Sequence, residues 1–263
     1  MIHIITNSME QGSFNKKVAI VTGAGQGIGF EICRQLAVNG ASVLLNDLDE
    51  KMANEAAEKI RSANGTCIAV SGDSSSVPFI QHMIEIAVQQ FGKVDIIIAN
   101  AGITLFGDFF SYPVESFNRV MEVNLAGTFF LAQAGANQMK QQSTGGSILL
   151  TSSVTGHQAH KNLAAYGMSK AALEMLAKNL VIELSPFNIN INTIAPGATI
   201  TERTLQDKEY ENTWSRLTPL GRPASTSDIA NAALFLVSSS AKHITGQSLV
   251  IDGGWTSISP SPF

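Results

Sequence analysis

Short apolar runs rich in β-branched residues alternate along the chain with longer stretches of helical spacing. Between the runs, apolar residues recur as in Ile28, Ile32 and Leu36, spaced i, i+4 and i+8. This alternation predicts an α/β fold, a doubly wound parallel sheet of about seven strands with helices on both faces. The runs with the near-continuous hydrophobicity of strands buried on both faces are Lys17–Thr22, Ser42–Asn46, Thr66–Val70, Val94–Ile98, Ser147–Thr151, Ile189–Ile194 and Ser248–Ile251.

The chain is predicted to consist of a short leader and one domain. The first residues have no basic n-region and too short an apolar run for a secretory signal, so we expect 1–14 to be a flexible leader. No repeat, low-complexity tract or Pro/Ser linker divides residues 15–263. The one long non-strand insertion, Ala198–Leu220, is typical of a functional lid or a surface excursion.

Composition narrows the class of protein. Hydrophobic residues make up 44% and charged residues 14% of the chain, which excludes disorder and indicates extensive burial. The net charge of −4 gives no electrostatic footprint for nucleic acid, and no apolar run reaches the roughly 18 residues of a membrane span. Cys33 and Cys67 lack partners at metal-ligand spacing. Their even number leaves a disulfide open, but the missing secretory signal favours buried free thiols and a cytoplasmic location.

A glycine-rich loop, Thr22–Gly29, follows the first predicted strand and opens the next helix. Its glycines do not keep strict G-x-G-x-x-G spacing, but they let the backbone turn sharply beside a pyrophosphate. The helix N-terminus adds free N–H groups and the positive end of the helix dipole. A glycine-rich loop between a strand and a helix is typical of a dinucleotide-binding site. The loop residues expected to contact the cofactor are Gly23, Gln26, Gly27, Ile28 and Gly29.

The second predicted strand runs into Asp47. A carboxylate about 20 residues after the glycines is positioned to accept hydrogen bonds from the adenosine ribose, and its charge repels a 2′-phosphate. Neither Gln26 nor Leu48 is a cation that could bind such a phosphate. With Asp47 and Leu48 at the adenosine end of the site, NAD is favoured over NADP. The alternative for Asp47 is a turn residue at a strand end.

Tyr166 and Lys170 lie four residues apart in Leu163–Leu184, a stretch with the apolar spacing of one long helix. Residues at i and i+4 meet on one side of a helix. A cation close to a phenol favours the phenolate, so this pair could take a proton from an alcohol. Ser153, after the fifth predicted strand, could hydrogen-bond the reacting oxygen. Each residue alone also fits a surface or turn position.

With its further motifs, the chain resembles the short-chain dehydrogenase/reductase family from about Asn15 to Trp255. This resemblance implies a Rossmann-type, dinucleotide-binding catalytic domain over residues 15–263. Because ligands bind outside the carboxyl ends of parallel strands, the matches that follow predicted strands should converge on one sheet edge. The matches are the glycine loop, Asp73, Asn100-Ala101-Gly102, Asn124, Ser153, Tyr166 with Lys170, Pro196-Gly197, Thr201, and Gly246-Gln247 through Asp252-Gly253-Gly254.

The resemblance implies a role for each match. Tyr166 would be the general acid/base, and Ser153 would hold the substrate oxygen. Lys170 would bind the nicotinamide ribose and assist the tyrosine, and Asn124 would support a water-linked proton path to that lysine. Thr199 departs from the aliphatic residue usual in the family. Expected along the cofactor, with Tyr166 and Lys170, are Asp73, Asn100, Gly102, Pro196, Gly197, Thr199 and Thr201.

Substrate contacts are expected from Ser153, Tyr166, Thr104 and His157, with residues 198–220 as the substrate loop. His157 and His160 are three residues apart, but no carboxylate or cysteine lies near them in sequence, so no metal is predicted. The chain is most similar to the sugar and polyol members of the family, of the glucose 1-dehydrogenase kind. The resemblance therefore implies an NAD-dependent enzyme that interconverts a secondary alcohol or sugar hydroxyl, of a sugar, polyol or sugar acid, and its carbonyl.

Two alternative functions fit parts of the sequence, one of them another enzyme and the other a protein of a different class. A 3-oxoacyl-type carbonyl reductase would be expected to carry basic residues that select NADPH, and these are missing. A non-catalytic NAD-binding regulatory protein conflicts with the complete set of catalytic residues. The resemblance also implies a homotetramer. Small residues on the catalytic helix and the helix before it permit close helix contact, although intrachain packing explains them equally well: Ala126, Gly127, Ala132, Ala134, Gly135, Ala136, Ala171 and Ala177.

Overall fold

The computed structural model describes residues 13–259, so residues 1–12 of the predicted leader lie outside the described residues. Phe14, which the sequence placed in the leader, belongs to the folded body. It is 2% exposed and packs in the core, and its N–H donates to the carbonyl oxygen of Asn39 at 3.0 Å. A large aromatic ring gains more from burial than a polar leader residue would.

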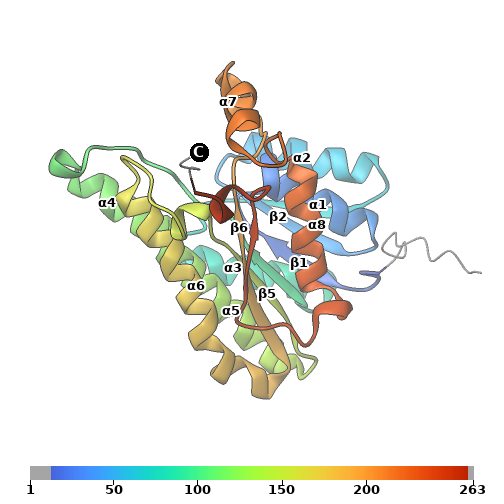
Figure 1. Cartoon of the computed structure of the whole chain (residues 1–263). Helices are drawn as coiled ribbons and strands as arrows, with labels where there is room; N and C mark the ends of the chain where they lie inside the picture. Colours follow the sequence, from blue (N-terminus) through green and yellow to red (C-terminus); the bar gives the residue numbers. More distant parts are fainter. Residues whose placement is uncertain (1–12, 260–263) are drawn as a thin grey trace, which may run out of the picture.

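One seven-stranded sheet in which all neighbours are parallel forms the centre of the molecule, in the order β3-β2-β1-β4-β5-β6-β7 (Figure 1). The predicted doubly wound α/β fold is confirmed. The strands are β1 (Val18–Val21), β2 (Ser42–Asp47), β3 (Thr66–Ser71), β4 (Ile96–Ala99), β5 (Gly146–Thr151), β6 (Ile189–Pro196) and β7 (Ser248–Ile251).

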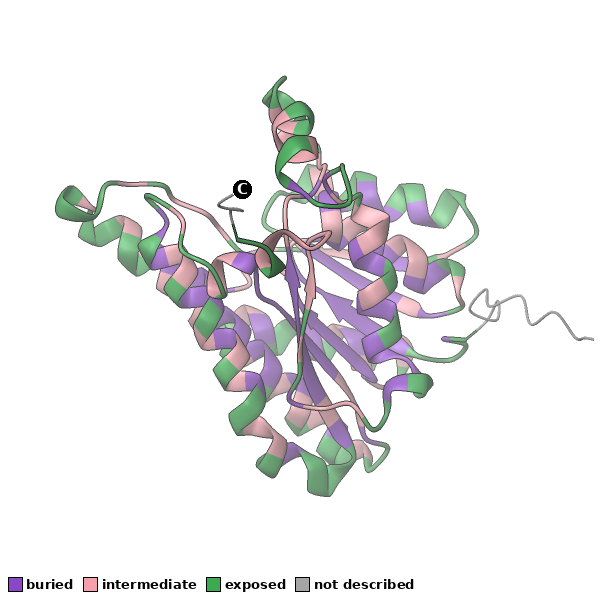
Figure 2. Cartoon of the chain, viewed as in Figure 1, coloured by how far each residue is buried: buried purple, intermediate pink, exposed green. Residues whose placement is uncertain are grey.

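Helices cover both faces of this sheet, and the inner strands are largely buried, whereas the edge strands β3 and β7 are partly exposed (Figure 2). One face packs against α1 (Gly27–Val38), α2 (Glu50–Ser62) and α8 (Thr226–Val237). The other packs against α3 (Val77–Phe91), α5 (Thr128–Gln142) and α6 (Ala164–Leu184). Two-sided burial explains why the strands are continuous apolar runs rather than alternating ones.

The order of the strands reverses beside β1. The chain builds β1, β2 and β3 outward, then returns through α3 to place β4 on the other side of β1. Ala19 is thus opposite both Val43 of β2 and Ile96 of β4. The loops that leave β1 and β4 diverge at this point, which opens a crevice at the carboxyl ends of the strands.

Two irregular segments border that crevice. A π-helical turn, Glu122–Gly127, joins α4 (Val114–Met121) to α5. The predicted insertion after β6 contains a short 3₁₀ turn, Thr204–Gln206, and α7 (Tyr210–Leu217), which stands above the sheet in Figure 1. No helix within residues 13–259 is both long and apolar enough to cross a membrane.

Candidate active site

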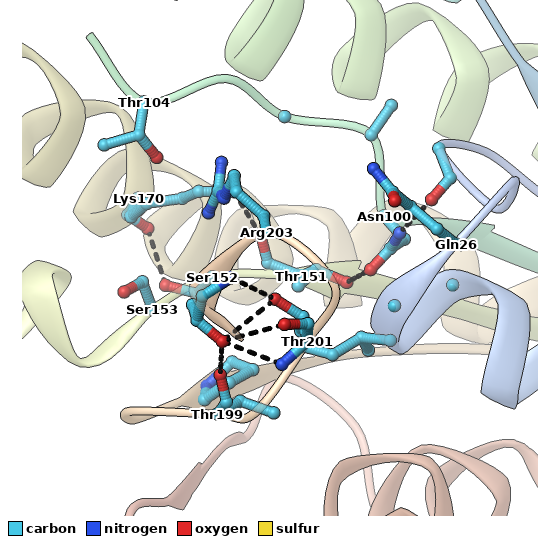
Figure 3. Close-up of a pocket in the computed structure, with 18 of the residues that line it drawn as sticks. Gln26, Asn100, Thr104, Thr151, Ser152, Ser153, Lys170, Thr199, Thr201 and Arg203 are labelled. Atoms are coloured by element: carbon cyan, nitrogen blue, oxygen red, sulfur yellow. Dashed lines mark hydrogen bonds between the residues drawn. The ribbon is translucent and has the colours of Figure 1, made fainter. Parts of the chain in front are cut away.

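A pocket lies at the carboxyl ends of the strands, where the sequence expected the ligand (Figure 3). It is walled by the loops after β1, β4, β5 and β6 and by the first turns of α6. Five predicted residues are not among those lining it: Asp47, Leu48, Asp73, Asn124 and His157. The predicted residues that do line it are Gly23, Gln26, Gly27, Ile28, Gly29, Asn100, Gly102, Thr104, Ser153, Tyr166, Lys170, Pro196, Gly197, Thr199 and Thr201.

The glycine loop and the start of α1 form a tightly packed cradle. Gly23 has a φ of +61°, in the left-handed region that favours glycine. A Cβ on Gly29 would lie 2.6 Å from the amide nitrogen of Asn100, so a side chain there would displace that residue. Asn100 in turn donates from Nδ2 to the carbonyl oxygen of Gly23 at 2.9 Å. Only glycine therefore lets α1 begin this close to the end of β4.

The N-terminus of α1 already interacts with an anionic oxygen. The N–H of Gly27 donates to a carboxylate oxygen of Glu202 at 3.0 Å. Helix N-termini favour anions because their first N–H groups lack partners within the helix. The residues of the cradle therefore fit the pyrophosphate of a dinucleotide, as the expected cofactor requires.

Residues expected at the adenosine end lie around the neighbouring strand ends. The Asp47 carboxylate accepts hydrogen bonds from the N–H of Gly25 at 2.9 Å and from the N–H of Asp49 at 3.2 Å. Gly25 suits this position because a Cβ there would lie 2.9 Å from an oxygen of Asp47. Leu48, beside it, is 67% exposed. The Asp47 carboxylate is therefore held against the glycine loop, while the next residue, Leu48, is exposed.

Asp73 makes protein contacts of its own. Its carboxylate accepts from the N–H and hydroxyl of Ser75 at 2.9 and 2.7 Å, and from the guanidinium of Arg119 at 3.0 Å. Burial pushes the pKa of Asp73 up, but these hydrogen bonds and the positive charge outweigh it, so the pKa lies below its usual value. A contact of this residue with adenine stays a prediction.

Tyr166 and Lys170 lie in the first turns of α6 and both face the pocket. The Lys170 amine lies 5.5 Å from the centre of the tyrosine ring and donates to the carbonyl oxygen of Thr151 at 2.8 Å. Only 3% of this lysine is exposed. Burial lowers the pKa of Lys170, because it penalises the charged amine, while the charge of Tyr166 opposes this effect.

Asn124 lies behind the pocket, in the π-helical turn. Its side chain accepts from the N–H of Ile103 at 2.8 Å and donates to the carbonyl of Ile103 at 3.0 Å. A Cβ on Gly102 would lie 3.2 Å from the amine of Lys170 and 3.3 Å from the amide oxygen of Asn124. The structure therefore brings the side chains of Asn124 and Lys170 close together beside Gly102, and the irregular turn that carries Asn124 is of a kind frequent at functional sites.

Ser153 lines the pocket at the end of β5 and caps a short 3₁₀ turn, Val154–Gly156, by accepting from the N–H of Thr155 at 3.3 Å. His157 points elsewhere. Its Nε2 pairs with the carboxylate of Glu174 at 2.8 Å, and that carboxylate also accepts from the hydroxyl of Ser152 at 2.7 Å. The structure thus gives His157 a partner on α6 rather than a place in the pocket lining.

The insertion after β6 adds pocket residues that sequence reasoning missed. Thr199 donates from its N–H to the phenol oxygen of Tyr210 at 3.2 Å, so the first helical residue of α7 is tied to the predicted cofactor loop. Aromatic rings continue this wall outward, with Tyr210 near Trp214, Trp214 against Trp255, and Trp255 against His160. The missed lining residues are Ala101, Thr151, Ser152, Glu202, Arg203, Thr204 and Tyr210.

A glycine cradle for a pyrophosphate, next to a tyrosine and a buried lysine in the same pocket, defines the class of a nicotinamide-dependent oxidoreductase. Known proteins agree with this class. A family model described as enoyl-(acyl carrier protein) reductase matches residues 23–256. The chain belongs to the short-chain dehydrogenase/reductase family, as its motifs predicted. It is therefore an NAD(P)-dependent enzyme that interconverts an alcohol and a carbonyl.

Relatives with named activities cover almost the whole chain. An L-rhamnose 1-dehydrogenase (NAD(P)(+)) of Azotobacter vinelandii is 36% identical over 245 residues, which are 90% of this chain and 96% of the relative. A 7alpha-hydroxysteroid dehydrogenase of Escherichia coli is 37% identical over 243 residues, 90% of this chain and 93% of the relative.

Solved structures agree with the fold. A 7alpha-hydroxysteroid dehydrogenase complexed with NADH and 7-oxo glycochenodeoxycholic acid has a TM-score of 0.88 at 36% identity, covering 93% of this chain and 96% of that one. A short-chain type dehydrogenase/reductase from Mycobacterium marinum has a TM-score of 0.87 at 32% identity, covering 92% and 97%.

Proposed function

We propose that the enzyme uses NAD to oxidise a hydroxyl group of a sugar, polyol or sugar acid to the carbonyl, in a reversible reaction. The observation that carries the proposal is one pocket that holds Ser153, Tyr166 and Lys170 beside the glycine cradle. Similarity to L-rhamnose 1-dehydrogenases from more than one organism supports a sugar as the substrate class. Named relatives of this kind favour neither an oxoacyl reductase nor a protein without activity.

In the oxidative direction, Tyr166 takes the hydroxyl proton of the substrate, and Ser153 donates a hydrogen bond to the same oxygen. Nicotinamide, when bound in the cradle, would supply the hydride-accepting chemistry. Lys170, held by the carbonyl of Thr151, stabilises the tyrosine phenolate by its charge and contacts the nicotinamide ribose. Asn124 holds Ile103 and lies beside Gly102 near the lysine, where it can support a water that exchanges the proton.

The preference for NAD rests on the charge of Asp47. This carboxylate is fixed by the N–H of Gly25, so it cannot turn away from a 2′-phosphate without losing a hydrogen bond. Two negative charges about 4 Å apart repel by roughly 4 kcal/mol at the effective dielectric of a protein surface. Leu48, the exposed neighbour, adds no cation that would offset this repulsion.

The substrate is proposed to enter between the loop after β4 and residues 198–220. Thr104 lines the pocket and is the better supported of the two predicted substrate contacts outside the catalytic set. Tyr210 of α7 lines the same pocket, and its ring is near Trp214, which in turn packs against Trp255. Aromatic ring faces suit the C–H side of a sugar ring, while the hydroxyls meet Ser153, Thr104 and Tyr166.

The aromatic wall and the 37% identity to 7alpha-hydroxysteroid dehydrogenase make a hydroxysteroid the second candidate substrate. Purified enzyme should be assayed by NADH formation with L-rhamnose and other aldoses, polyols, aldonates and a 7α-hydroxy bile acid. A 3-oxoacyl thioester with NADH or NADPH tests the reductase. We expect turnover with sugars and NAD. Turnover confined to the bile acid or the thioester would replace the proposed substrate class, and no turnover despite NADH binding would refute the activity.

We further infer that the chain forms a homotetramer through α5 and α6. Several small residues of these helices pack within the chain, since Ala132 and Ala177 are 1% exposed and Gly135 contacts Ile97. Larger apolar side chains on α6 are exposed instead. Met168, Met175 and Ile182 recur every seven residues and are 51%, 54% and 82% exposed. Residues seven apart lie on one side of a helix, so the three form a stripe that a second copy can cover.

A further inference from the structure

The carboxylate that holds the start of α1 comes from a distant loop. Glu202 lies 175 residues after Gly27 in the chain, yet one of its oxygens is 3.0 Å from the Gly27 nitrogen. Helix α1 has no acidic residue in its first turn, and the side chain of its N-cap, Gln26, makes no capping hydrogen bond. Glu202 thus supplies the anion that α1 does not provide for itself.

The turn that presents Glu202 is held by its own hydrogen bonds. The Thr204 hydroxyl accepts from the N–H of Thr201 at 2.8 Å and donates to the carbonyl of Thr199 at 3.0 Å. The Glu202 side chain lies outside these bonds, and its residue is exposed. It can therefore leave Gly27 by a side-chain rotation that the turn does not resist.

Arg203 is the next residue of the same turn and lines the same pocket. Figure 3 shows it in that pocket together with Lys170, Gln26 and Asn100. Within residues 13–259, its guanidinium makes no hydrogen bond or ion pair with a protein group. A free guanidinium beside a phosphate cradle is chemically suited to a diphosphate, which it can contact through two N–H groups.

We propose that Glu202 competes with the dinucleotide pyrophosphate for the N-terminus of α1, and that Arg203 binds that pyrophosphate once Glu202 has moved away. The inference rests on the assignment of this pocket to the dinucleotide. A carboxylate and a diphosphate cannot both accept from Gly27 without repelling each other. Because Glu202 occupies the N-terminus of α1 in the chain without cofactor, competition lowers the fraction of enzyme whose cradle is open, and so it weakens binding and slows association of the cofactor.

Binding measurements on Glu202→Gln and Arg203→Gln test the proposal without relying on activity. NADH is titrated by fluorescence, and ADP-ribose and adenosine by competition against NADH. Because glutamine has no charge, we expect Glu202→Gln to bind NADH and ADP-ribose about tenfold more tightly, and Arg203→Gln to bind both about tenfold more weakly. Adenosine, which carries no phosphate, should bind all variants within about twofold. Stopped-flow association of NADH should quicken in Glu202→Gln by about the factor by which its Kd falls.

The matched control is Glu209→Gln, an exposed residue of the same insertion whose loss changes the net charge equally. The proposal is overturned if Glu202→Gln leaves the Kd and association rate of NADH unchanged, or if Glu209→Gln tightens binding as much. The proposal is also overturned if the affinity for adenosine rises in Glu202→Gln by as much as the affinity for ADP-ribose. If wild type binds neither NADH nor adenosine, the assignment of the pocket itself fails, which is a different result from equal binding by every variant.

Discussion

The amine of Lys170 donates to the carbonyl oxygen of Thr151, so the catalytic helix is tied to the last residue of β5 over 2.8 Å. Ser152 adds a second tie to α6, because its hydroxyl donates to the carboxylate of Glu174 at 2.7 Å and also lies 3.0 Å from the carbonyl oxygen of Lys170. Ser153 follows directly. These contacts hold the acid/base helix and the serine loop at one distance from each other, as a proton transfer between substrate and tyrosine requires.

Replacing Tyr166 by phenylalanine removes the proposed acid/base and leaves the ring. We expect kcat to fall by about 10²–10⁴-fold, while the affinity for NADH stays within about twofold, because the cofactor cradle is formed by other residues. Steady-state assays and NADH fluorescence titration measure the two effects. Tyr112→Phe is the control, since that phenol donates to the carbonyl of Leu105 and does not line the pocket. Activity near wild type in Tyr166→Phe would exclude the assigned role.

Asp47→Asn should shift cofactor selection toward NADPH. The asparagine oxygen can still accept from the N–H of Gly25, so the variant loses the charge and keeps the contact. Since about 1.4 kcal/mol corresponds to a tenfold change, partial relief of the repulsion is expected to improve the NADPH-to-NADH ratio of kcat/KM by roughly tenfold. Asp49→Asn makes the same charge change two residues away, at the N-cap of α2. Equal shifts in both variants would contradict a specific role for Asp47.

Glu31 should make the stability of the fold depend on acid pH. Hydrogen bonds from Arg34, opposed by burial and aided by Gln35 and Ser227, lower the pKa of Glu31 to about 2 from its usual 4.5. A lowered pKa means that the charged form stabilises the fold above pH 4.5, and that this contribution disappears as the pH falls through about 2. Its size is on the order of 3 kcal/mol at neutral pH.

Urea unfolding of Glu31→Gln checks this effect. The variant should be less stable than wild type at pH 7, and the difference in unfolding free energy should shrink steadily between pH 4.5 and pH 2. Glu58→Gln is the control, because Glu58 also pairs with an arginine three residues on but lies on the surface, where such pairs contribute little. A difference that stays constant with pH would refute the assignment to the Glu31 charge.

The apolar stripe of α6 gives a prediction about assembly. Ile182→Glu and Met175→Glu place a charge where a second copy is proposed to pack, so we expect the tetramer to dissociate into smaller species. Light scattering after gel filtration measures the mass. Leu205→Glu serves as control, because Leu205 is 62% exposed but lies in the insertion after β6. A wild-type monomer, or a tetramer that survives both α6 substitutions, would contradict the inferred interface.

The fold and the centre of the site could be predicted because their signals are local. A strand that is buried on both faces appears in the sequence as one apolar run, and Tyr166 and Lys170 lie one turn apart on the same helix. Strand ends were less predictable: β6 continues to Pro196 because β7 pairs with it there, and that partner lies more than fifty residues on. Contacts between distant segments left no pattern at all.

The pairing of Glu202 with Gly27 shows this limit most clearly. Nothing in the composition of the insertion marks Glu202 or Arg203, apart from their place directly after Thr201. His157 is predicted to contact the substrate, whereas in the structure its imidazole pairs with the carboxylate of Glu174, which lies seventeen positions later on another element. Charged side chains pair with groups that are close in space, and the order of residues in the sequence does not show which groups the fold brings close.

Helix α1 is covered by α8, and the two are joined where Ser227 donates to Glu31 at 2.8 Å, 196 residues further along the chain. During synthesis on the ribosome, the apolar side of α1 therefore stays uncovered until α8 has been made. At about 5–20 residues per second this delay is on the order of 10–40 s. Nascent chains therefore expose the apolar side of α1 until α8 has been synthesised, and exposed apolar surface of this kind promotes aggregation.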